Sequence, residues 1–135
     1  MQNIVLVALG GATGATARYL ASGAALRVMG PDWPWGTFAV NIVGSGLMGM
    51  LIGWLVGLDV KGATPAILTS ANWRLLLATG VLGGFTTFSA FSLETANMIE
   101  RKAYSAAAVY SIGSVVLGVA ALSAGLAIAR KVFAS

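Results

Sequence analysis

The sequence has 135 residues, of which 58% are hydrophobic and only twelve are charged: eight Lys or Arg and four Asp or Glu. Ordinary globular chains carry about a quarter charged residues, so this composition excludes a water-soluble fold. The absence of Cys and His also excludes thiol chemistry, disulfides and most zinc sites. Although the net charge is +4, eight dispersed cations form no basic stripe of the kind that binds nucleic acid.

The charged residues leave long apolar stretches between them. A helix needs about 20 apolar residues to cross a bilayer, and a backbone in lipid must satisfy its own hydrogen bonds. We therefore predict an all-α membrane protein in which residues 1–135 form one domain with four transmembrane helices. The predicted spans are 4–25, 38–58, 75–99 and 104–129.

The first two spans each carry a costly polar residue, Arg18 and Asn41. Because one loop joins the two helices, both residues lie on the same side of the membrane at similar depth. A cation and an amide that can donate two hydrogen bonds suit a place where an anion loses water. Alternatively, Arg18 extends to the interface and Asn41 makes an interhelical hydrogen bond.

Several spans carry small residues at four-residue spacing, which lets helix backbones approach closely. Gly49, Gly53 and Gly57 form the longest such series. The shorter ones are Gly10/Gly14, Gly80/Gly84 and Ser114/Gly118. Amphipathic rings mark the predicted span ends, where they favour the membrane interface. These rings are Trp33, Trp35, Trp73 and Tyr104.

The third span contains an unusual segment at residues 83–92, GGFTTFSAFS. Paired glycines followed by two β-branched threonines are poor helix formers, so we predict a break near the middle of this span. Unwound carbonyls at such a break can coordinate a cation such as Na⁺. Phe88 and Phe91 share one helix face beyond the break, and their positive ring edges could solvate an anion. They could instead be core or lipid-facing rings.

The fourth span adds three hydroxyls, those of Tyr104, Ser111 and Ser114, which are expected roughly on one face. Such hydroxyls can also merely bond the preceding turn. Only residues 100–103 connect the third and fourth spans, so these helices must be antiparallel neighbours. Glu94 is a vestibule or interface carboxylate that could pair with Arg18 or with Arg101.

The positive charges give little orientation signal, because four lie on one side of the predicted membrane and three on the other. The positive-inside rule acts through an asymmetry, so we expect insertion both ways and an antiparallel homodimer. The alternative is that other signals fix one orientation. In either case these cations meet anionic lipid headgroups. The two sets are Lys61, Arg74, Arg130 and Lys131, and Arg27, Arg101 and Lys102.

An enzyme is not expected, because no Ser has an acidic partner at an interpretable spacing and no Gly-rich phosphate loop precedes a Lys. The strongest rival to an anion pathway is a small dual-topology multidrug exporter that exchanges protons for cationic drugs. Those exporters depend on a carboxylate in the first span, where this chain has Arg18. A structural membrane subunit would explain the packing glycines but not the broken span.

Three segments of the chain resemble the Fluc/CrcB family of fluoride channels. They are Gly11-Ala12-Thr13-Gly14-Ala15 with Arg18, Gly36-Thr37 with Val40-Asn41, and Gly83-Gly84-Phe85-Thr86-Thr87-Phe88-Ser89-Ala90-Phe91-Ser92. The resemblance covers essentially the whole chain, and the three motifs together are highly specific.

The resemblance implies a passive, fluoride-selective channel in a bacterial inner membrane, built as an antiparallel homodimer with two pores. It implies a central Na⁺ held by the backbone carbonyls of Gly83 and Thr86. The implied anion pathway comprises Asn41, Phe88, Phe91, Tyr104, Ser111, Ser114, Thr37 and Arg18. Ala90 departs from the family, which often has a threonine between the two phenylalanines.

Overall fold

A computed structural model of the chain describes residues 1–60 and 70–133, and all regular structure in these residues is helical. The elements in chain order are α1 (Gln2–Met29), α2 (Trp35–Val60), α3 (Ser70–Trp73), the π-helix η1 (Arg74–Leu82), α4 (Gly83–Phe85), α5 (Phe88–Glu100) and α6 (Tyr104–Phe133). The elements from α3 to α5 together form one crossing, Ala71–Glu100. Four helices are thus long and apolar enough to span a membrane, which confirms the predicted all-α fold with four crossings.

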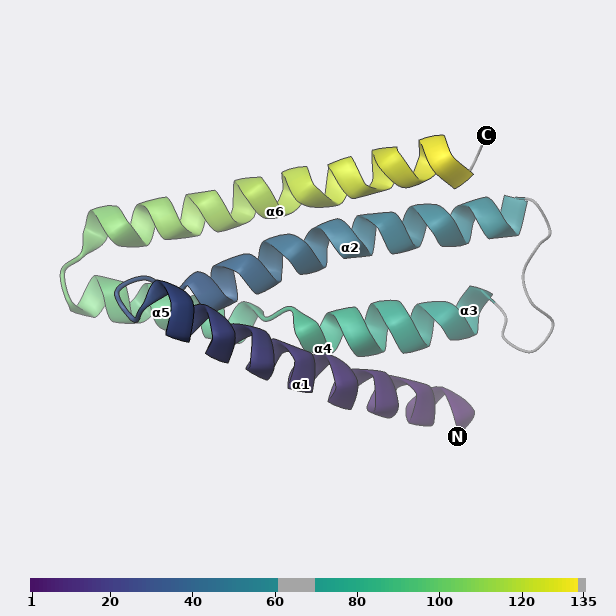
Figure 1. Ribbon diagram of the computed structural model, residues 1–135, viewed down its shortest axis with the longest axis horizontal. Helices are drawn as coiled ribbons and strands as arrows, with labels where there is room; N and C mark the ends of the chain where they lie inside the picture. Colours follow the sequence, from purple (N-terminus) through teal and green to yellow (C-terminus); the bar gives the residue numbers. More distant parts are fainter. Residues whose placement is uncertain (61–69, 134–135) are drawn as a thin grey trace.

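The helices lie lengthwise side by side, with both termini at one end of the bundle (Figure 1). The largest helix interfaces join α2 to α6 and α1 to η1, and α1 also packs on α4. The α1–α2 connection and the α5–α6 turn lie at the end opposite the termini. Because α5 and α6 are joined by this tight turn and contact each other, the predicted antiparallel pair is confirmed.

Each crossing extends a few residues beyond its predicted span. Two of the helices end where a residue adopts a positive φ. α1 ends at Gly30, whose φ of 81° suits a residue without a Cβ, and whose N–H donates to the Leu26 carbonyl at 3.0 Å. α5 ends before Lys102, which has a φ of 61° and donates its N–H to the Ile99 carbonyl at 2.9 Å. This left-handed residue reverses the chain into α6.

The small-residue faces predicted from the sequence form the closest helix contacts. A methyl group added at Gly49 would meet the Leu122 carbonyl of α6, and one added at Gly14 would meet the Val81 carbonyl of η1. Gly53 similarly faces Ala129. The glycines therefore allow backbone-to-backbone packing that any larger residue would prevent.

The π-helix η1 is a feature that the sequence did not predict. Its residues, Arg74–Leu82, are compatible with an ordinary α-helix, so their composition gives no sign of the wider turn. η1 lies directly before the break of the third crossing, against Gly10 and Gly14 of α1. π-helical turns are rare and are often found near functional sites.

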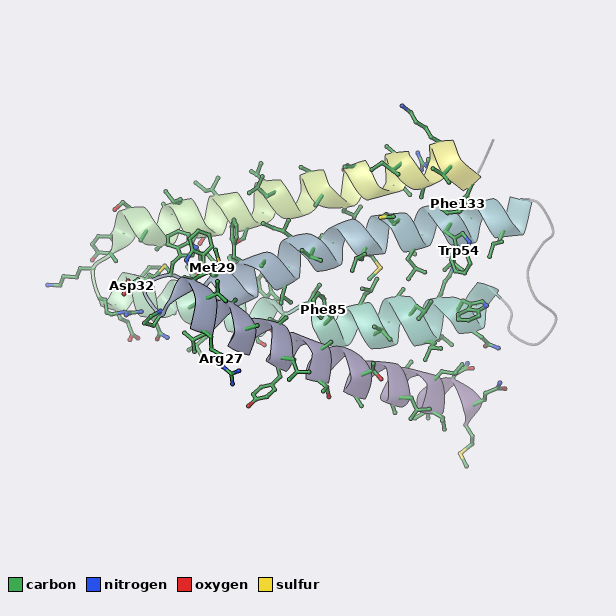
Figure 2. All side chains as sticks on the ribbon, viewed as in Figure 1. Arg27, Met29, Asp32, Trp54, Phe85 and Phe133 are labelled. Atoms are coloured by element: carbon green, nitrogen blue, oxygen red, sulfur yellow. The ribbon has the colours of Figure 1, made fainter. Side chains whose placement is uncertain are left out.

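Aromatic side chains occupy both ends of the bundle, as predicted. The rings of Trp33 and Trp35 lie 6.0 Å apart at the start of α2, near the end where Figure 2 shows Asp32. The rings of Trp54 and Trp73 lie 6.3 Å apart at the opposite end. Lys61, which entered the charge balance, lies outside the described residues.

Candidate functional site

The third crossing is broken at two residues, Thr86 and Thr87. Both have extended backbone, with φ and ψ of −79° and 158° at Thr86 and −151° and 121° at Thr87. α4 ends at Phe85 and α5 begins at Phe88, so the break lies inside the predicted segment and confirms that prediction. The Thr87 hydroxyl caps α5 by accepting from the Ala90 N–H at 3.3 Å.

Asn41 of α2 satisfies the backbone at the break. Its Nδ2 donates to the Thr87 carbonyl at 2.9 Å, and its Oδ1 accepts from the Thr87 N–H at 2.8 Å. In a continuous α-helix the Thr87 N–H would donate to the carbonyl of Gly83. Asn41 therefore makes the interhelical bond that was one of its two sequence interpretations, and the second hydrogen of its Nδ2 remains for another acceptor.

Arg18 of α1 approaches the same break from the other side. Its Nε donates to the Gly84 carbonyl at 3.1 Å, at the carbonyl end of α4. A cation is favourable there because the last carbonyls of a helix lack partners and carry partial negative charge. Arg18 thus contacts the backbone of the third crossing rather than only extending to the interface.

A cavity of about 350 Å³, here called the break cavity, opens beside these groups. Its lining is Asn41, Gly44, Ser45, Met48, Thr86, Thr87, Phe88, Phe91, Ser114, Val115 and Leu122. Asn41, Phe88, Phe91 and Ser114, which the sequence placed on an anion pathway, thus lie around one space. None of its lining residues is charged, so the cavity offers neutral donors and rings.

The two phenylalanines of the break cavity lie next to each other at the start of α5. Their ring centroids are 5.6 Å apart, with 42° between the ring planes. Phe91 is half-buried, whereas Phe88 is 78% exposed in the single chain. Phe85, labelled in Figure 2, lies on the other side of the break and packs against Gly44 of α2.

The hydroxyls expected on one face of the fourth span differ in their surroundings. Ser114 is 8% exposed, and its Oγ is buried with no hydrogen-bond partner among the described residues. The Oγ of Ser111 lies 3.4 Å from the Oγ1 of Thr95, and Ser111 does not line the break cavity. Tyr104 is 62% exposed at the start of α6. The structure therefore brings only Ser114 to the break cavity.

A second cavity of about 300 Å³, here called the loop cavity, lies between the α1–α2 connection and α5. Thr37 and Glu94 line it, and the Thr37 hydroxyl donates to Glu94 Oε1 at 2.7 Å. The other carboxylate oxygen, Oε2, accepts from the Tyr110 hydroxyl at 2.6 Å. Glu94 is therefore held by two hydroxyls. The two ion pairs suggested for Glu94 are not among its contacts. Arg101 instead donates its Nε to the Asn97 carbonyl, and Arg18 donates its Nε to the Gly84 carbonyl.

Tyr110 is a residue that the sequence analysis missed. It is fully buried, and its ring contacts Trp33, Phe38 and Phe91. It lies one helical turn before Ser114 on the same face of α6, and this four-residue spacing was the available signal. Tyr104, the tyrosine predicted from the sequence, lies at the start of α6. Tyr110 connects the two cavities, since Phe91 lines one and Glu94 the other.

The break also bears on the Na⁺ that the resemblance implies. The described residues contain no group of three or more Asp, Glu, His or Cys side chains that could hold an ion. The carbonyls at the end of α4 suit a hard monovalent cation better. Gly83 is exposed, and its carbonyl loses the Thr87 N–H to Asn41. The donors present are therefore compatible with Na⁺ held by the carbonyls of Gly83 and Thr86.

Comparisons with known proteins identify the family of the chain. The family model described as "CrcB-like protein, Camphor Resistance (CrcB)" matches residues 5–126. A relative from Caulobacter vibrioides (strain NA1000 / CB15N) is 58% identical over 134 residues, covering 99% of this chain and 100% of the relative. One from Phenylobacterium zucineum is 59% identical with the same coverage, and one from Agrobacterium fabrum is 48% identical over 98% of this chain and 100% of the relative.

All three relatives are named "Fluoride-specific ion channel FluC", which describes a channel and not an enzyme. The family model covers most of the chain, and the relatives align over essentially the whole of it. The resemblance noted in the sequence is thereby confirmed. This chain is a multi-pass membrane protein that belongs to the CrcB family.

Proposed function

We propose that this protein is a passive, fluoride-selective channel of a bacterial inner membrane. The break cavity carries the proposal, because it combines hydrogen-bond donors and aromatic rings without any charged side chain. A cationic substrate would need acidic groups there. The proposal agrees with the names of the relatives.

The chemistry follows from the hydration of fluoride, a small anion that must exchange its water for other donors. Asn41 has one Nδ2 hydrogen free, and the Ser114 hydroxyl is unpaired among the described residues. The rings of Phe88 and Phe91 add their positive edges. Because these groups are neutral, each contact is weak enough to release the ion, as conduction requires.

Residues outside the break cavity would act at its approaches. Thr37 lies in the loop cavity. Its hydroxyl would bind an entering ion after breaking its hydrogen bond to Glu94. Arg18 uses one guanidinium N–H on the Gly84 carbonyl and has others that favour anions nearby. Tyr104 and Ser111 remain predicted members of the pathway at the loop end of α6.

We further propose that the channel is an antiparallel homodimer with two pores. The exposure of Phe88 supports this, since a pore ring that is 78% exposed leaves the break cavity without a wall on that side. A second copy would supply the wall. The carbonyls of Gly83 and Thr86 from both copies would hold a central Na⁺, whose charge offsets the negative ends of the two half-helices.

Flux measurements with purified protein in liposomes test this function. Vesicles loaded with potassium fluoride or potassium chloride are diluted into ion-free buffer, and valinomycin is added to balance charge. We expect rapid fluoride release and retention of chloride, measured with ion-selective electrodes. Release no faster than from protein-free vesicles would overturn the proposal, and proton-driven uptake of a lipophilic cation would favour a multidrug exporter.

A matched pair of variants links the flux to the ring edges. Phe88→Ile keeps an apolar side chain but removes the ring, so we expect a severe loss of fluoride release. Leu93→Ile changes another exposed apolar residue of α5, 62% exposed, and should leave release unchanged. Equal rates for both variants would exclude the ring-edge role.

A further inference from the structure

Ser45 lies on α2 one helical turn after Asn41 and lines the break cavity. Residues four apart share a helix face, so Ser45 continues the polar line that Asn41 begins. Ser45 takes no part in the hydrogen bonds between Asn41 and Thr87 or between Arg18 and Gly84.

The Ser45 hydroxyl is available for a ligand. Hydroxyls inside membrane helices usually donate to the carbonyl four residues earlier. Thr13, Thr16 and Thr95 each do so at 2.8 Å. Within residues 1–60 and 70–133, neither Ser45 nor Ser114 makes such a bond, and the Ser114 Oγ is also buried.

The facing residue of α6 leaves room beside this hydroxyl. α2 and α6 run in the same direction, as the pairs Gly49 with Leu122 and Gly53 with Ala129 show. In the same register Ser45 faces Gly118, and a Cβ placed on Gly118 would lie 3.6 Å from the Ser45 Oγ. Because residue 118 has no side chain, the hydroxyl of Ser45 faces a gap.

Two unpaired hydroxyls thus border one part of the break cavity from facing helices. Ser114 lies one turn before Gly118 on the same face of α6, so in this register it lies opposite Asn41 and diagonally across from Ser45. Three further residues that line the cavity, Met48, Val115 and Leu122, are apolar. An ion between the two serines would find these hydroxyls in place of water.

We infer that Ser45, together with Ser114 diagonally across from it, forms a second coordination position for a small dehydrated halide, next to the position that faces Asn41. This inference rests on the proposed fluoride channel and deepens it. Ser45 lies one turn, about 5.4 Å, along α2 from Asn41, so an ion can pass from the Asn41 amide to the Ser45 hydroxyl in a single step. Two weak neighbouring positions are what rapid conduction requires.

The test compares Ser45 variants in the vesicle assay for fluoride release. Removing a donor to a charged ligand in Ser45→Ala is expected to lower the release rate by about tenfold. Ser45→Thr keeps the hydroxyl and should stay within about threefold of the original protein, because only a methyl group is added. The matched control is Ser123→Ala, which removes a hydroxyl from an exposed position of α6.

If Ser45 serves only for packing, Ser45→Cys should conduct like the original protein, because it keeps the size of the side chain. If the hydroxyl binds the ion, Ser45→Cys should release fluoride as slowly as Ser45→Ala, because a thiol donates only weakly. It also serves as the deciding variant if Ser45→Ala elutes as an aggregate in size-exclusion chromatography. The inference is overturned if Ser45→Ala or Ser45→Cys conducts within twofold of the original protein, or if Ser45→Thr is as slow as Ser45→Ala. A failure of the original protein to release fluoride would instead overturn the proposed function.

Discussion

At the scale of single residues, the site depends on side chains that satisfy the backbone and serve the cavity at the same time. Asn41 pairs both polar groups of Thr87 and keeps one hydrogen for the break cavity. Glu94 is similarly held through both oxygens, by Thr37 and Tyr110. Buried polar groups without partners are costly, so these bonds determine where the crossing can break.

Asn41→Ala tests this double role. The substitution leaves the N–H of Thr87 unpaired and removes one of the bonds to its carbonyl, and a buried unpaired donor costs about 1–3 kcal/mol. We therefore expect a clearly lower midpoint of thermal unfolding in detergent, followed by fluorescence-detected size exclusion, together with loss of fluoride release. Asn3→Ala, at an exposed position of α1, is the control. If release falls while the midpoint is unchanged, Asn41 acts only on the ion.

At the scale of elements, the bundle combines rigid helix pairs with one interrupted crossing. α2 packs on α6 through glycines that bring the backbones together. α1 packs on η1 and α4 in the same way and reaches the break through Arg18. The irregular backbone at residues 86–87 is tolerated because it lines a cavity and its groups are bonded to neighbouring helices.

Gly49→Ala tests the close packing of α2 on α6. The added methyl group would meet the Leu122 carbonyl, so the helices must separate, and overpacking typically costs about 1–3 kcal/mol. We expect a lower unfolding midpoint and a smaller yield of folded protein. A methyl group at Gly23 of α1 would meet nothing within 4 Å, so Gly23→Ala should leave the midpoint unchanged or slightly raised. Equal midpoints for the two variants would contradict the packing shown here.

At the scale of the whole molecule, the single chain leaves functional surface uncovered. Phe88 and Gly83, at the break, are both exposed. The cations near the membrane are also nearly balanced between the two ends of the bundle. Both features agree with the proposed pairing of two oppositely inserted copies, each covering the break of the other.

Cysteine labelling tests this dual insertion, because the chain contains no cysteine of its own. Glu100→Cys places a thiol at the α5–α6 turn, and Gln2→Cys places one at the end that carries both termini. With no orientation bias, a membrane-impermeant maleimide should label about half of each variant from outside intact cells. Nearly complete labelling of one variant and none of the other would show a single orientation.

The sequence alone was sufficient for the membrane class, the four crossings and the position of the break. These properties follow from composition and local conformational preference, which each segment carries by itself. The spacing of Gly49, Gly53 and Gly57 likewise indicated a packing face before its partner was known. Family membership was also readable, because the motifs are contiguous in the chain.

The tertiary structure was needed wherever function depends on which helices face each other. It showed that Asn41 bonds to Thr87 and Arg18 to Gly84, although these residues lie far apart along the chain. It also showed that Tyr110 bonds to Glu94, which depends on the register of α6 against α5. It also separated Tyr104 from the break cavity and brought Ser45 into it. Helical periodicity places residues on a face, but only the packing of one helix against another decides what that face meets.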